Sequence, residues 1–414
     1  MQVHIDPRRV LATLRALARF GAQGKGVSRP ALSPEDMAAR RWLAGQMREA
    51  GLEADIDAVG NVYGRTPGVR HALLVGSHSD SVPNGGWLDG ALGVVYGLEA
   101  ARAWRAQQPH APVGIDVIAF SDEEGRYLSC LGSRSFCEAL DGIDPGRLQY
   151  GGATLAEAAA AAGLPAQGLA RLEPARHLAY LEAHIEQGPR LDDGGLDVGI
   201  VTGIAGMQRY LVQFGGRADH AGTTPMAVRK DAALAAFEFA LACEAALRRA
   251  GGPDSVWNFG ALALQPGVAN VVARSATLTV EFRDLSPEVL ERLAQALHEC
   301  VSLRDGQRGV SVAATRQNAL APARMDPALQ AHLQAQARQA GARSLALPSG
   351  AIHDAMVLAR RVPTAMLFIP SIGGRSHTPV EDTAERHIML GAEVFCGALA
   401  RAAQQAAPGG AAAK

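Results

Sequence analysis

The stretch LLVGSHSDSVPNGGWLDGALGV, residues 73–94, joins an apolar segment to a helical one through a polar loop. Residues 72–76 have the pattern of a buried strand, and residues 90–107 have that of a long helix. A second apolar strand is expected over residues 114–120. A strand, a helix and another strand in this order are typical of a βαβ unit with parallel strands. The stretch therefore predicts an α/β fold with a mostly parallel sheet flanked by helices.

The alternation of strands and helices continues toward both ends of the chain but is interrupted in the middle. The SPED sequence at residues 33–36 is typical of a helix start, with a serine N-cap, a proline at the first position and acids in the first turn. Residues 208–315 instead combine two helices with several strands, one of them at 268–272, which indicates a smaller α+β domain with an open antiparallel sheet. The expected domains are a discontinuous catalytic domain of residues 1–208 and 324–414, and an inserted domain of residues 209–323.

Composition narrows the class of protein. The 414 residues suffice for two or three domains with a large core. Lys and Arg total 40 against 41 Asp and Glu, so the near-neutral chain shows no electrostatic signature of a nucleic-acid or membrane partner. No membrane-spanning run or signal peptide is evident, and five scattered cysteines fit free buried thiols in a reducing cytoplasm. We expect a cytoplasmic protein with a frayed tail at residues 408–414.

Candidate reactive side chains gather where predicted strands end. In open α/β sheets, ligands bind beyond the carboxyl ends of the strands. Commoner alternatives exist for each group: a helix N-cap for the aspartate before residue 90, a solvated turn for the acidic pair, and structural roles for the histidines. The candidates are His78, Asp80 and Asp89 after the first strand, Glu123 and Glu124 after the second, His184, Glu186 and Gln187 after a segment at 178–183, and His377 and Glu381 after a segment at 364–369.

The candidates combine imidazole and carboxylate groups without cysteine, a mixture that suits zinc, manganese or cobalt. Residues two apart in an extended chain share a face, so His78 could bind a metal while Asp80 orients it. Two ions sharing one carboxylate would lower the pKa of a bridging water and polarise a carbonyl. A free glutamate would take the proton of that water and pass it to a leaving nitrogen. The motifs of serine hydrolases, P-loop nucleotidases and Rossmann dehydrogenases are absent from the sequence.

These segments, in this order, resemble the M20-type metal-dependent amidohydrolases. Within them they are similar to the hydantoinase/carbamoylase amidase branch, which contains N-carbamoyl-L-amino-acid hydrolase, β-ureidopropionase, and allantoate and ureidoglycolate amidohydrolases. Further similar segments are GVSRPALSPED, DAVGNVYGR, ADHAGTTPMAVRKDA and SGAIHDAM. The resemblance runs from about Arg8 to the last expected helix, which is nearly the whole chain.

The resemblance assigns roles to the candidate metal ligands and the base. It also implies a cis peptide bond after the bridging aspartate, a strained bond that would help to aim its carboxylate. The implied roles are His78 and His184 as ligands of one metal, Glu124 and His377 as ligands of the other, Asp89 as the bridge, Asp80 as the support of His78, and Glu123 as the general base.

The inserted domain would be a lid and dimerisation domain by the same resemblance. His220 would stabilise the tetrahedral oxyanion, and Arg283 would clamp the substrate carboxylate. Asn270 and Gln187 would add hydrogen bonds to the substrate. Some of these groups would come from the partner subunit of a homodimer. Without the resemblance, Arg283 would be interpreted as a strand-surface arginine.

Two departures from the pattern of relatives bear on the substrate. Ile352 replaces the usual glycine beside His353, in the stretch that lines the substrate pocket of relatives. Arg375 stands where relatives often carry an aliphatic residue. Both change the bulk or the charge of the pocket, so the exact substrate stays open.

The leading hypothesis is a binuclear-metal amidase that uses zinc, manganese or cobalt. It would hydrolyse the carbamoyl C–N bond of an N-carbamoyl-L-amino acid or a related ureido acid, releasing ammonia and carbon dioxide. The alternatives are an allantoate or ureidoglycolate amidohydrolase, an N-acyl-amino-acid acylase or peptidase of the same superfamily, and a scaffold protein without metal.

Overall fold

The computed structural model describes residues 3–140 and 142–406, so the tail expected at 408–414 lies outside the described residues. The chain divides into two compact units. The first unit is Met1–Thr202 with Met325–Lys414, and the second unit is Gly203–Arg324. The first division precedes residue 208 because Gly206 and Met207 already pair in the sheet of the second unit.

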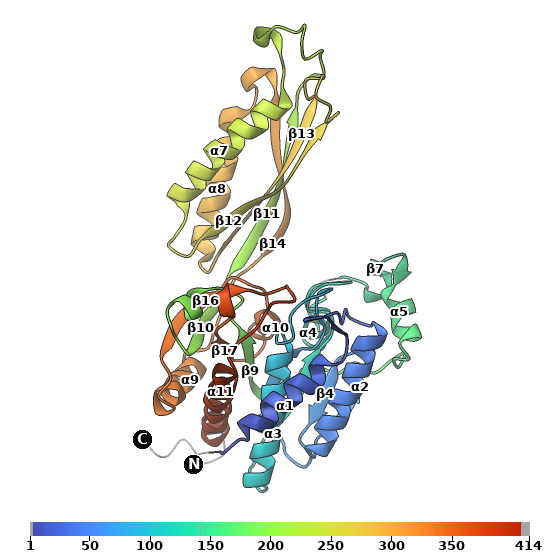
Figure 1. Cartoon of the computed structure of the whole chain (residues 1–414), viewed down its shortest axis with the longest axis vertical. Helices are drawn as coiled ribbons and strands as arrows, with labels where there is room; N and C mark the ends of the chain where they lie inside the picture. Colours follow the sequence, from blue (N-terminus) through green and yellow to red (C-terminus); the bar gives the residue numbers. More distant parts are fainter. Residues whose placement is uncertain (1–2, 141, 407–414) are drawn as a thin grey trace. The chain divides into compact units, whose positions relative to one another are not determined.

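A nine-stranded sheet organises the first unit (Figure 1). Its central strands β17, β9, β5 and β6 pair in parallel, whereas β15, β10, β4 and β3 pair antiparallel. This confirms the predicted α/β fold with a mostly parallel sheet. In spatial order the strands are β15 (Ala323–Arg324), β10 (Val198–Ile204), β17 (Thr364–Ile369), β9 (His177–Ile185), β5 (His71–His78), β6 (Val113–Phe120), β4 (Val62–Arg65) and β3 (Glu53–Ile56), with β16 (Ser344–Ser349) paired to β10.

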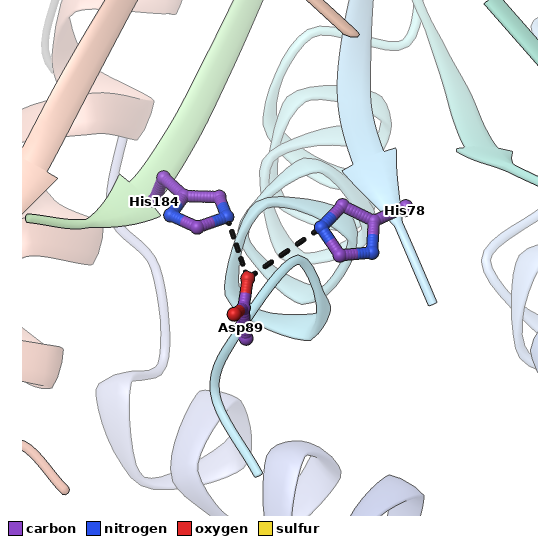
Figure 2. Close-up of side chains that lie close together, drawn as sticks. All are labelled: His78, Asp89 and His184. Carbon is purple, nitrogen blue, oxygen red and sulfur yellow. Dashed lines mark ion pairs between the residues drawn. The ribbon is translucent and has the colours of Figure 1, made fainter. Parts of the chain in front are cut away.

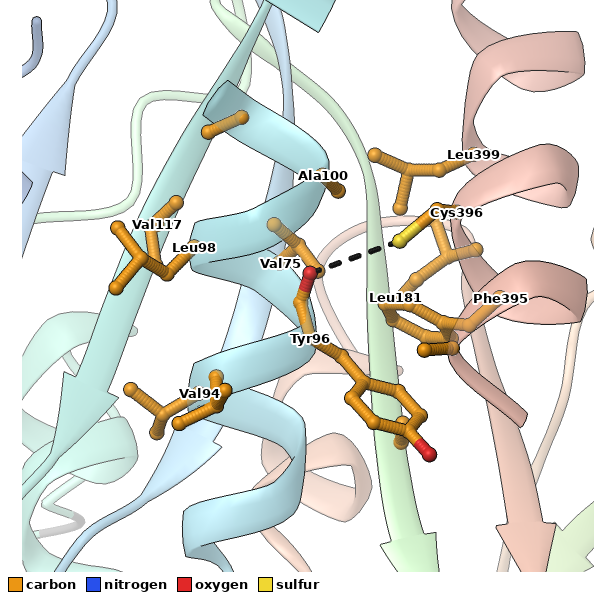
Figure 3. Close-up of a cluster of buried hydrophobic side chains, with 14 of the residues drawn as sticks. Val75, Val94, Tyr96, Leu98, Ala100, Val117, Leu181, Phe395, Cys396 and Leu399 are labelled. Carbon is orange, nitrogen blue, oxygen red and sulfur yellow. Dashed lines mark hydrogen bonds between the residues drawn. The ribbon is translucent and has the colours of Figure 1, made fainter. Parts of the chain in front are cut away.

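Helices pack on this sheet and bury its apolar side chains. The helix α3 (Ala91–Gln107) packs on β5 and β6, and α1 (Pro7–Ala18) and α11 (Glu385–Ala406) pack against α3. Figure 3 shows the resulting core, in which Val75 and Val117 of the sheet lie among side chains of α3 and α11. The remaining elements of the unit are α2 (Pro34–Glu49), α4 (Leu131–Phe136), α5 (Leu155–Ala161), α6 (Arg190–Asp193), α9 (Pro327–Gln339), α10 (Asp354–Leu358), β1 (Ala22–Gln23), β2 (Gly26–Val27), β7 (Gln149–Tyr150), β8 (Ala153–Thr154), η1 (Pro145–Arg147) and η4 (Ile372–Gly374).

Strand alternation decides which side chains leave the hydrophobic core. On β9, Leu181 and Ala183 belong to the core cluster, so His184 faces the opposite side of the sheet. On β5, Val75 belongs to the same cluster, and His78 at the strand end faces the opposite side. Because β5 and β9 are parallel neighbours, both histidines lie on one face at one end of the sheet.

The helix start predicted at residues 33–36 is confirmed. The Ser33 hydroxyl accepts a hydrogen bond from the Asp36 backbone N–H at 3.2 Å, and Pro34 is the first helical residue. The helix ends at Glu49, before Gly51, whose φ of 82° is the left-handed conformation typical after a helix.

The second unit is a four-stranded antiparallel sheet with two helices on one face (Figure 1). This confirms the predicted smaller domain with an open antiparallel sheet. The strand expected at 268–272 is wrong: Val271 donates to the Val268 carbonyl in a turn, because Gly267, with a φ of 73°, follows the end of a strand. The elements are β11 (Gly206–Gly215), η2 (Met226–Val228), α7 (Ala232–Ala250), β12 (Val256–Gln265), β13 (Ser275–Asp284), α8 (Pro287–Arg304), η3 (Gln307–Gly309) and β14 (Ser311–Leu320), in the sheet order β12, β13, β11, β14.

The cysteines and the apolar segments of the sequence can also be compared with the structure. All five cysteines are buried and free, as expected. Across residues 3–140 and 142–406, no helix is both long enough and apolar enough to cross a bilayer.

Candidate metal centre

The predicted site residues of the first unit lie where four parallel strands end. His78 is the last residue of β5, and His184 is the last but one of β9. Glu123 and Glu124 follow β6, and His377 follows β17. Parallel neighbours end at the same edge of a sheet, which is why segments far apart in sequence converge there.

A first group consists of two buried histidines around one aspartate (Figure 2). The Asp89 Oδ1 lies 3.0 Å from Nε2 of His184 and 3.6 Å from Nε2 of His78. The Nδ1 atoms turn away: that of His184 lies 2.8 Å from the Ile185 carbonyl oxygen, and that of His78 lies 3.1 Å from the Asp80 carbonyl oxygen. Each ring thus presents Nε2 to the aspartate, the arrangement that metal-binding histidines usually have.

A second group shares the same aspartate. The Asp89 Oδ2 lies 3.3 Å from Nε2 of His377, which in turn lies 3.5 Å from Oε2 of Glu124. The two carboxylate oxygens of Asp89 therefore face different groups of candidate ligands. A carboxylate placed in this way can bridge two cations.

The histidines of the two groups hold protons strongly in the absence of cations. Burial alone would lower the pKa of His78, but the carboxylates of Glu123, Asp89 and Asp80 outweigh burial and raise it well above its usual value. Burial likewise opposes the hydrogen bond to Asp89 at His184, and the pKa of His184 is raised. The hydrogen bond to Asp89 raises the pKa of His377 to about 9. Asp89, at the centre, has a pKa well below its usual range because hydrogen bonds from these histidines outweigh its burial.

Glu124 differs from Asp89 in that its pKa is raised rather than lowered. Burial, followed by repulsion from Asp89, raises the pKa of Glu124 to about 7. Its Oε1 atom is buried and has no hydrogen-bond partner. The centre thus attracts positive charge and contains an unsatisfied ligand oxygen, and its imidazole and carboxylate donors suit zinc, manganese or cobalt. The residues present fit two divalent cations.

Glu123 lies beside the first group and is buried. Its Oε2 is 3.7 Å from Nε2 of His78, and its Oε1 accepts a weak hydrogen bond from the Cys130 thiol at 3.8 Å. Burial raises the pKa of Glu123 well above its usual value. A buried carboxyl beside the candidate ligands is a candidate general base.

Asp80 contacts both strand-end loops. Its carbonyl oxygen, rather than its carboxylate, is the nearer partner of the His78 ring, since Oδ1 lies 3.9 Å from Nδ1. The carboxylate accepts a hydrogen bond from the Glu124 backbone N–H at 3.3 Å. Asp80 therefore connects the loop after β5 to the loop after β6.

Asp89 is held by residues that are distant from it in the sequence. The Glu381 Oε1 accepts hydrogen bonds from the backbone N–H groups of Leu88 and Asp89, at 3.2 and 3.1 Å. The Gln187 amide and the Ser376 hydroxyl donate to Asp89 Oδ2, at 3.0 and 3.3 Å. The resemblance implies a substrate contact for Gln187 and no role for Ser376, whereas both contact Asp89 here. Glu186 instead accepts hydrogen bonds at the start of α6, from the backbone N–H groups of residues 190 and 191.

The expected cis peptide bond after Asp89 is not found. The Asp89–Gly90 bond is trans, and Gln265–Pro266 is the only cis bond among the residues described. Gly90 instead makes the turn with a φ of 64°, and a Cβ there would lie 2.4 Å from Cε1 of the His78 ring. A glycine that allows both the turn and the close approach takes the place of the expected strain.

Three non-glycine residues around the centre adopt left-handed backbone conformations. They are Asp122, Gln187 and His377, with φ of 57°, 58° and 55°. Such conformations cost about 1–3 kcal/mol each and are concentrated at functional sites. Asp122 is stabilised by three backbone N–H groups, of residues 126 to 128, which donate to its carboxylate. The loops are thus held in defined conformations before any ligand binds.

The stretch around Ile352 and His353, predicted to line the substrate pocket, contacts a candidate metal ligand from within the protein interior. The His353 ring is buried and packs against the His184 ring, with 4.5 Å between centroids, and its Nε2 lies 2.9 Å from the Ser349 hydroxyl. Ile352 is half-buried and Arg375 is exposed. His353 therefore contacts a candidate metal ligand directly.

The remaining predicted residues belong to the second unit. His220 and Val271 form an isolated β-bridge, and the Ala221 N–H donates to the Asn270 carbonyl at 3.0 Å, so the loops of His220 and Asn270 are neighbours. Arg283 on β13 donates through Nε to Oε1 of Glu281 at 2.9 Å. The carboxylate of that glutamate also accepts from Arg209, so it orients two guanidinium groups on one sheet.

Comparison with known proteins agrees with this geometry. Residues 74–401 match Peptidase family M20/M25/M40. The chain is 36% identical over 404 residues to an N-carbamoyl-L-amino acid amidohydrolase of Geobacillus stearothermophilus, an alignment covering 94% of this chain and 97% of the relative. It is 34% identical over 382 residues to the allantoate amidohydrolase of Escherichia coli, covering 90% and 92%. Among solved structures, an amidase of the hydantoinase/carbamoylase family from Burkholderia phymatum superposes with a TM-score of 0.91 at 44% identity, covering 97% of this chain and 99% of the other.

Proposed function

The chain belongs to peptidase family M20/M25/M40, and we propose that within this family it hydrolyses the carbamoyl C–N bond of an N-carbamoyl-L-amino acid. Its relatives are amidohydrolases, and the chain is a hydrolase that acts on carbon–nitrogen bonds. The observation that carries the proposal is the shared Asp89, whose two oxygens face separate ligand groups beside the buried Glu123. Ammonia and carbon dioxide are the expected products.

The proposed metal ligands are His78 and His184 in one group, Glu124 and His377 in the other, and Asp89 between them. Two divalent ions, when bound, would supply a polarised carbonyl and a water of lowered pKa. Zinc, manganese and cobalt all suit these donors.

Glu123 is proposed to transfer the proton during the reaction. Its carboxylate takes a proton from the attacking water and delivers it to the departing nitrogen. Burial raises the pKa of Glu123 in the metal-free protein, which favours uptake of the water proton by its carboxylate.

The second unit is proposed to act as a lid and dimerisation domain. His220 would stabilise the oxyanion, Asn270 would donate to the substrate, and Arg283 would bind its carboxylate as a two-point fork. The amide of Gln187, which donates to Asp89 and Ser376, would support Asp89 instead. Closure of the lid would then exclude water from the reacting groups.

A substrate panel tests the proposal directly. Ammonia release is measured with N-carbamoyl-L-amino acids, allantoate, ureidoglycolate and N-acetyl-amino acids, each with manganese, cobalt or zinc. The highest kcat/KM is expected with an N-carbamoyl-L-amino acid. Absence of ammonia release from every ureido compound would refute the proposal.

Allantoate is the second candidate substrate, because the allantoate amidohydrolase relative is nearly as similar as the carbamoylase relative. Allantoate and N-carbamoyl-L-amino acids both carry a carboxylate and a ureido group, so one metal centre could hydrolyse either compound. A higher kcat/KM with allantoate in the same panel would favour this alternative.

The carboxylate clamp has a separate test. Arg283→Ala is expected to raise KM about 10- to 100-fold for carboxylate-bearing substrates, since it removes a charge-assisted pair worth about 1.5–3 kcal/mol. An unchanged KM would show that another group binds the carboxylate. Lys230→Ala is the control for loss of a positive charge in the same unit.

A further inference from the structure

Arg40 is a fully buried cation that neither the sequence motifs nor the proposed reaction uses. It lies on α2, and its side chain is 0% exposed. Nε donates to Asp36 Oδ2 at 2.7 Å, and NH1 donates to the carbonyl oxygens of Gly60 and Phe120 at 2.8 and 3.1 Å. NH2 donates to Asp80 Oδ1 at 3.5 Å. The guanidinium thus has a partner on each of its three nitrogens.

Two of these partners, Phe120 and Asp80, adjoin the segments that carry candidate metal ligands. Phe120 is the last residue of β6, just before the segment that contains Glu123 and Glu124. Asp80 joins the His78 ring through its carbonyl oxygen and the Glu124 backbone through its carboxylate. A single guanidinium therefore connects, through Asp80, one ligand from each group.

Charge explains why the connection can exist in the interior. Asp36 and Asp80 are both fully buried, and a buried carboxylate without a cation is costly. Arg40 lies between them and offsets both, while Asp36 is also fixed by the Leu32 backbone N–H at 2.8 Å. Lysine could supply the charge, but its single nitrogen cannot reproduce a planar fork with partners in several directions.

We propose that Arg40 is a positioning residue of the binuclear centre, which fixes the loops of His78 and Glu124 in one spacing by bonding Asp80 and the Phe120 carbonyl. The inference rests on the proposed metal centre. It concerns the free energy of assembling the ligands rather than contact with the substrate. Residues that orient metal ligands in this way typically contribute 10- to 100-fold to metal affinity.

The chain offers a matched control in Arg176, which is 3% exposed and directly precedes β9, at the start of that strand rather than at its end. Its Nε and NH2 donate to Asp116 at 2.7 and 3.0 Å, and it also donates to two backbone carbonyls, of Val69 and Thr66. Arg40 and Arg176 thus resemble each other in burial, charge and bonding, but only Arg40 adjoins the candidate ligands.

The experiment compares wild type, Arg40→Gln, Arg40→Lys and Arg176→Gln of the full chain. Stoichiometry and affinity for Co²⁺ are measured by chelator competition and by the d–d absorption spectrum, with thermal unfolding of the metal-free proteins alongside. Wild type is expected to bind two Co²⁺ ions. Both Arg40 variants are expected to lose about 10- to 100-fold in affinity and to change the spectrum, whereas Arg176→Gln keeps the wild-type affinity and spectrum.

The outcomes separate this inference from the proposed function. Wild type that binds fewer than two Co²⁺ ions contradicts the binuclear centre and the inference together. Wild type with two ions and an Arg40 variant of equal affinity and spectrum overturns the inference alone. An equal loss in Arg176→Gln also overturns it, because the effect would then be general destabilisation. If Arg40→Gln does not fold, the Co²⁺ affinity and spectrum of Arg40→Lys, which keeps the buried charge, decide whether the inference holds.

Discussion

Asp89 joins the two groups of candidate metal ligands because its two oxygens face different partners. Oδ1 faces His78 and His184, whereas Oδ2 faces His377 and accepts from Gln187 and Ser376. The residue also opens the turn at Gly90, so its position depends on backbone and side-chain contacts together. Single-residue changes around it can therefore separate proton transfer from metal binding.

Glu123→Gln is expected to lower kcat about 10²- to 10⁴-fold while leaving metal content unchanged, since the amide keeps the shape but cannot carry the proton. Steady-state ammonia release and metal analysis check both parts. Glu186→Gln is the control, because that carboxylate caps α6 and should leave kcat near wild type. Near-native activity of Glu123→Gln would exclude it as the base.

Gly90→Ala tests the close approach of the turn to His78. The added Cβ would lie 2.4 Å from the His78 ring, so the ring must move and affinity for the first metal should fall roughly tenfold or more. Gly68→Ala is the control, since Gly68 has a similar φ of 74° but open space around it. Chelator competition compares the two, and equal affinities would contradict the steric explanation.

At the scale of elements, local signals predicted the strands and helices well. The N-cap at Ser33 and the apolar segments of β5 and β6 depend on short-range sequence, and the structure confirms them. The strand expected at 268–272 failed because its valines favoured extended backbone, whereas the preceding Gly267 favoured a turn.

The parts of the site that sequence could not supply depend on distant contacts. Arg40 lies 40 residues from Asp80, and Glu381 lies 292 residues from the Asp89 backbone that it binds. No spacing or periodicity links such pairs, because the sheet order brings them together. Most of the proposed metal ligands could be suggested because they follow a recognisable strand, whereas Arg40 lies on a helix that carries none of them.

Asp116 on β6 predicts a pH dependence of stability. Burial would raise its pKa, but hydrogen bonds from His177, Arg176 and the Thr66 backbone outweigh burial and lower the pKa to about 2. The folded value lies below the unfolded one of about 3.8, so the stabilisation is complete above pH 4 and is lost as the pH falls toward 2.

The expected loss in the free energy of unfolding is about 2 kcal/mol over that interval. Urea unfolding of wild type and Asp116→Asn between pH 5 and pH 2 measures it. Their difference in stability should shrink as the pH falls, because the asparagine does not titrate. A difference independent of pH would contradict the assignment.

At the scale of the whole molecule, the proposed reaction requires groups from both units. The proposed metal ligands and Glu123 belong to the first unit, whereas His220 and Arg283 belong to the second. The proposed dimer would use the second unit, whose sheet ends in the edge strand β12. Edge strands with exposed apolar side chains favour pairing with another chain.

We expect the proposed dimer contact at the exposed apolar side chains of α7 and β12. Leu241 is 76% exposed and Leu262 is 42% exposed, and the helix and strand that carry them pack together. Leu241→Asp is expected to shift a dimer to monomers in light scattering coupled to size-exclusion chromatography, because a charge would be buried at the contact. Leu303→Asp is the control, since Leu303 is 70% exposed on α8 and lies outside the proposed contact. If the partner subunit supplies lid groups, Leu241→Asp also lowers kcat/KM, and both losses depend on protein concentration. A Leu241→Asp dimer as stable as wild type would place the interface elsewhere.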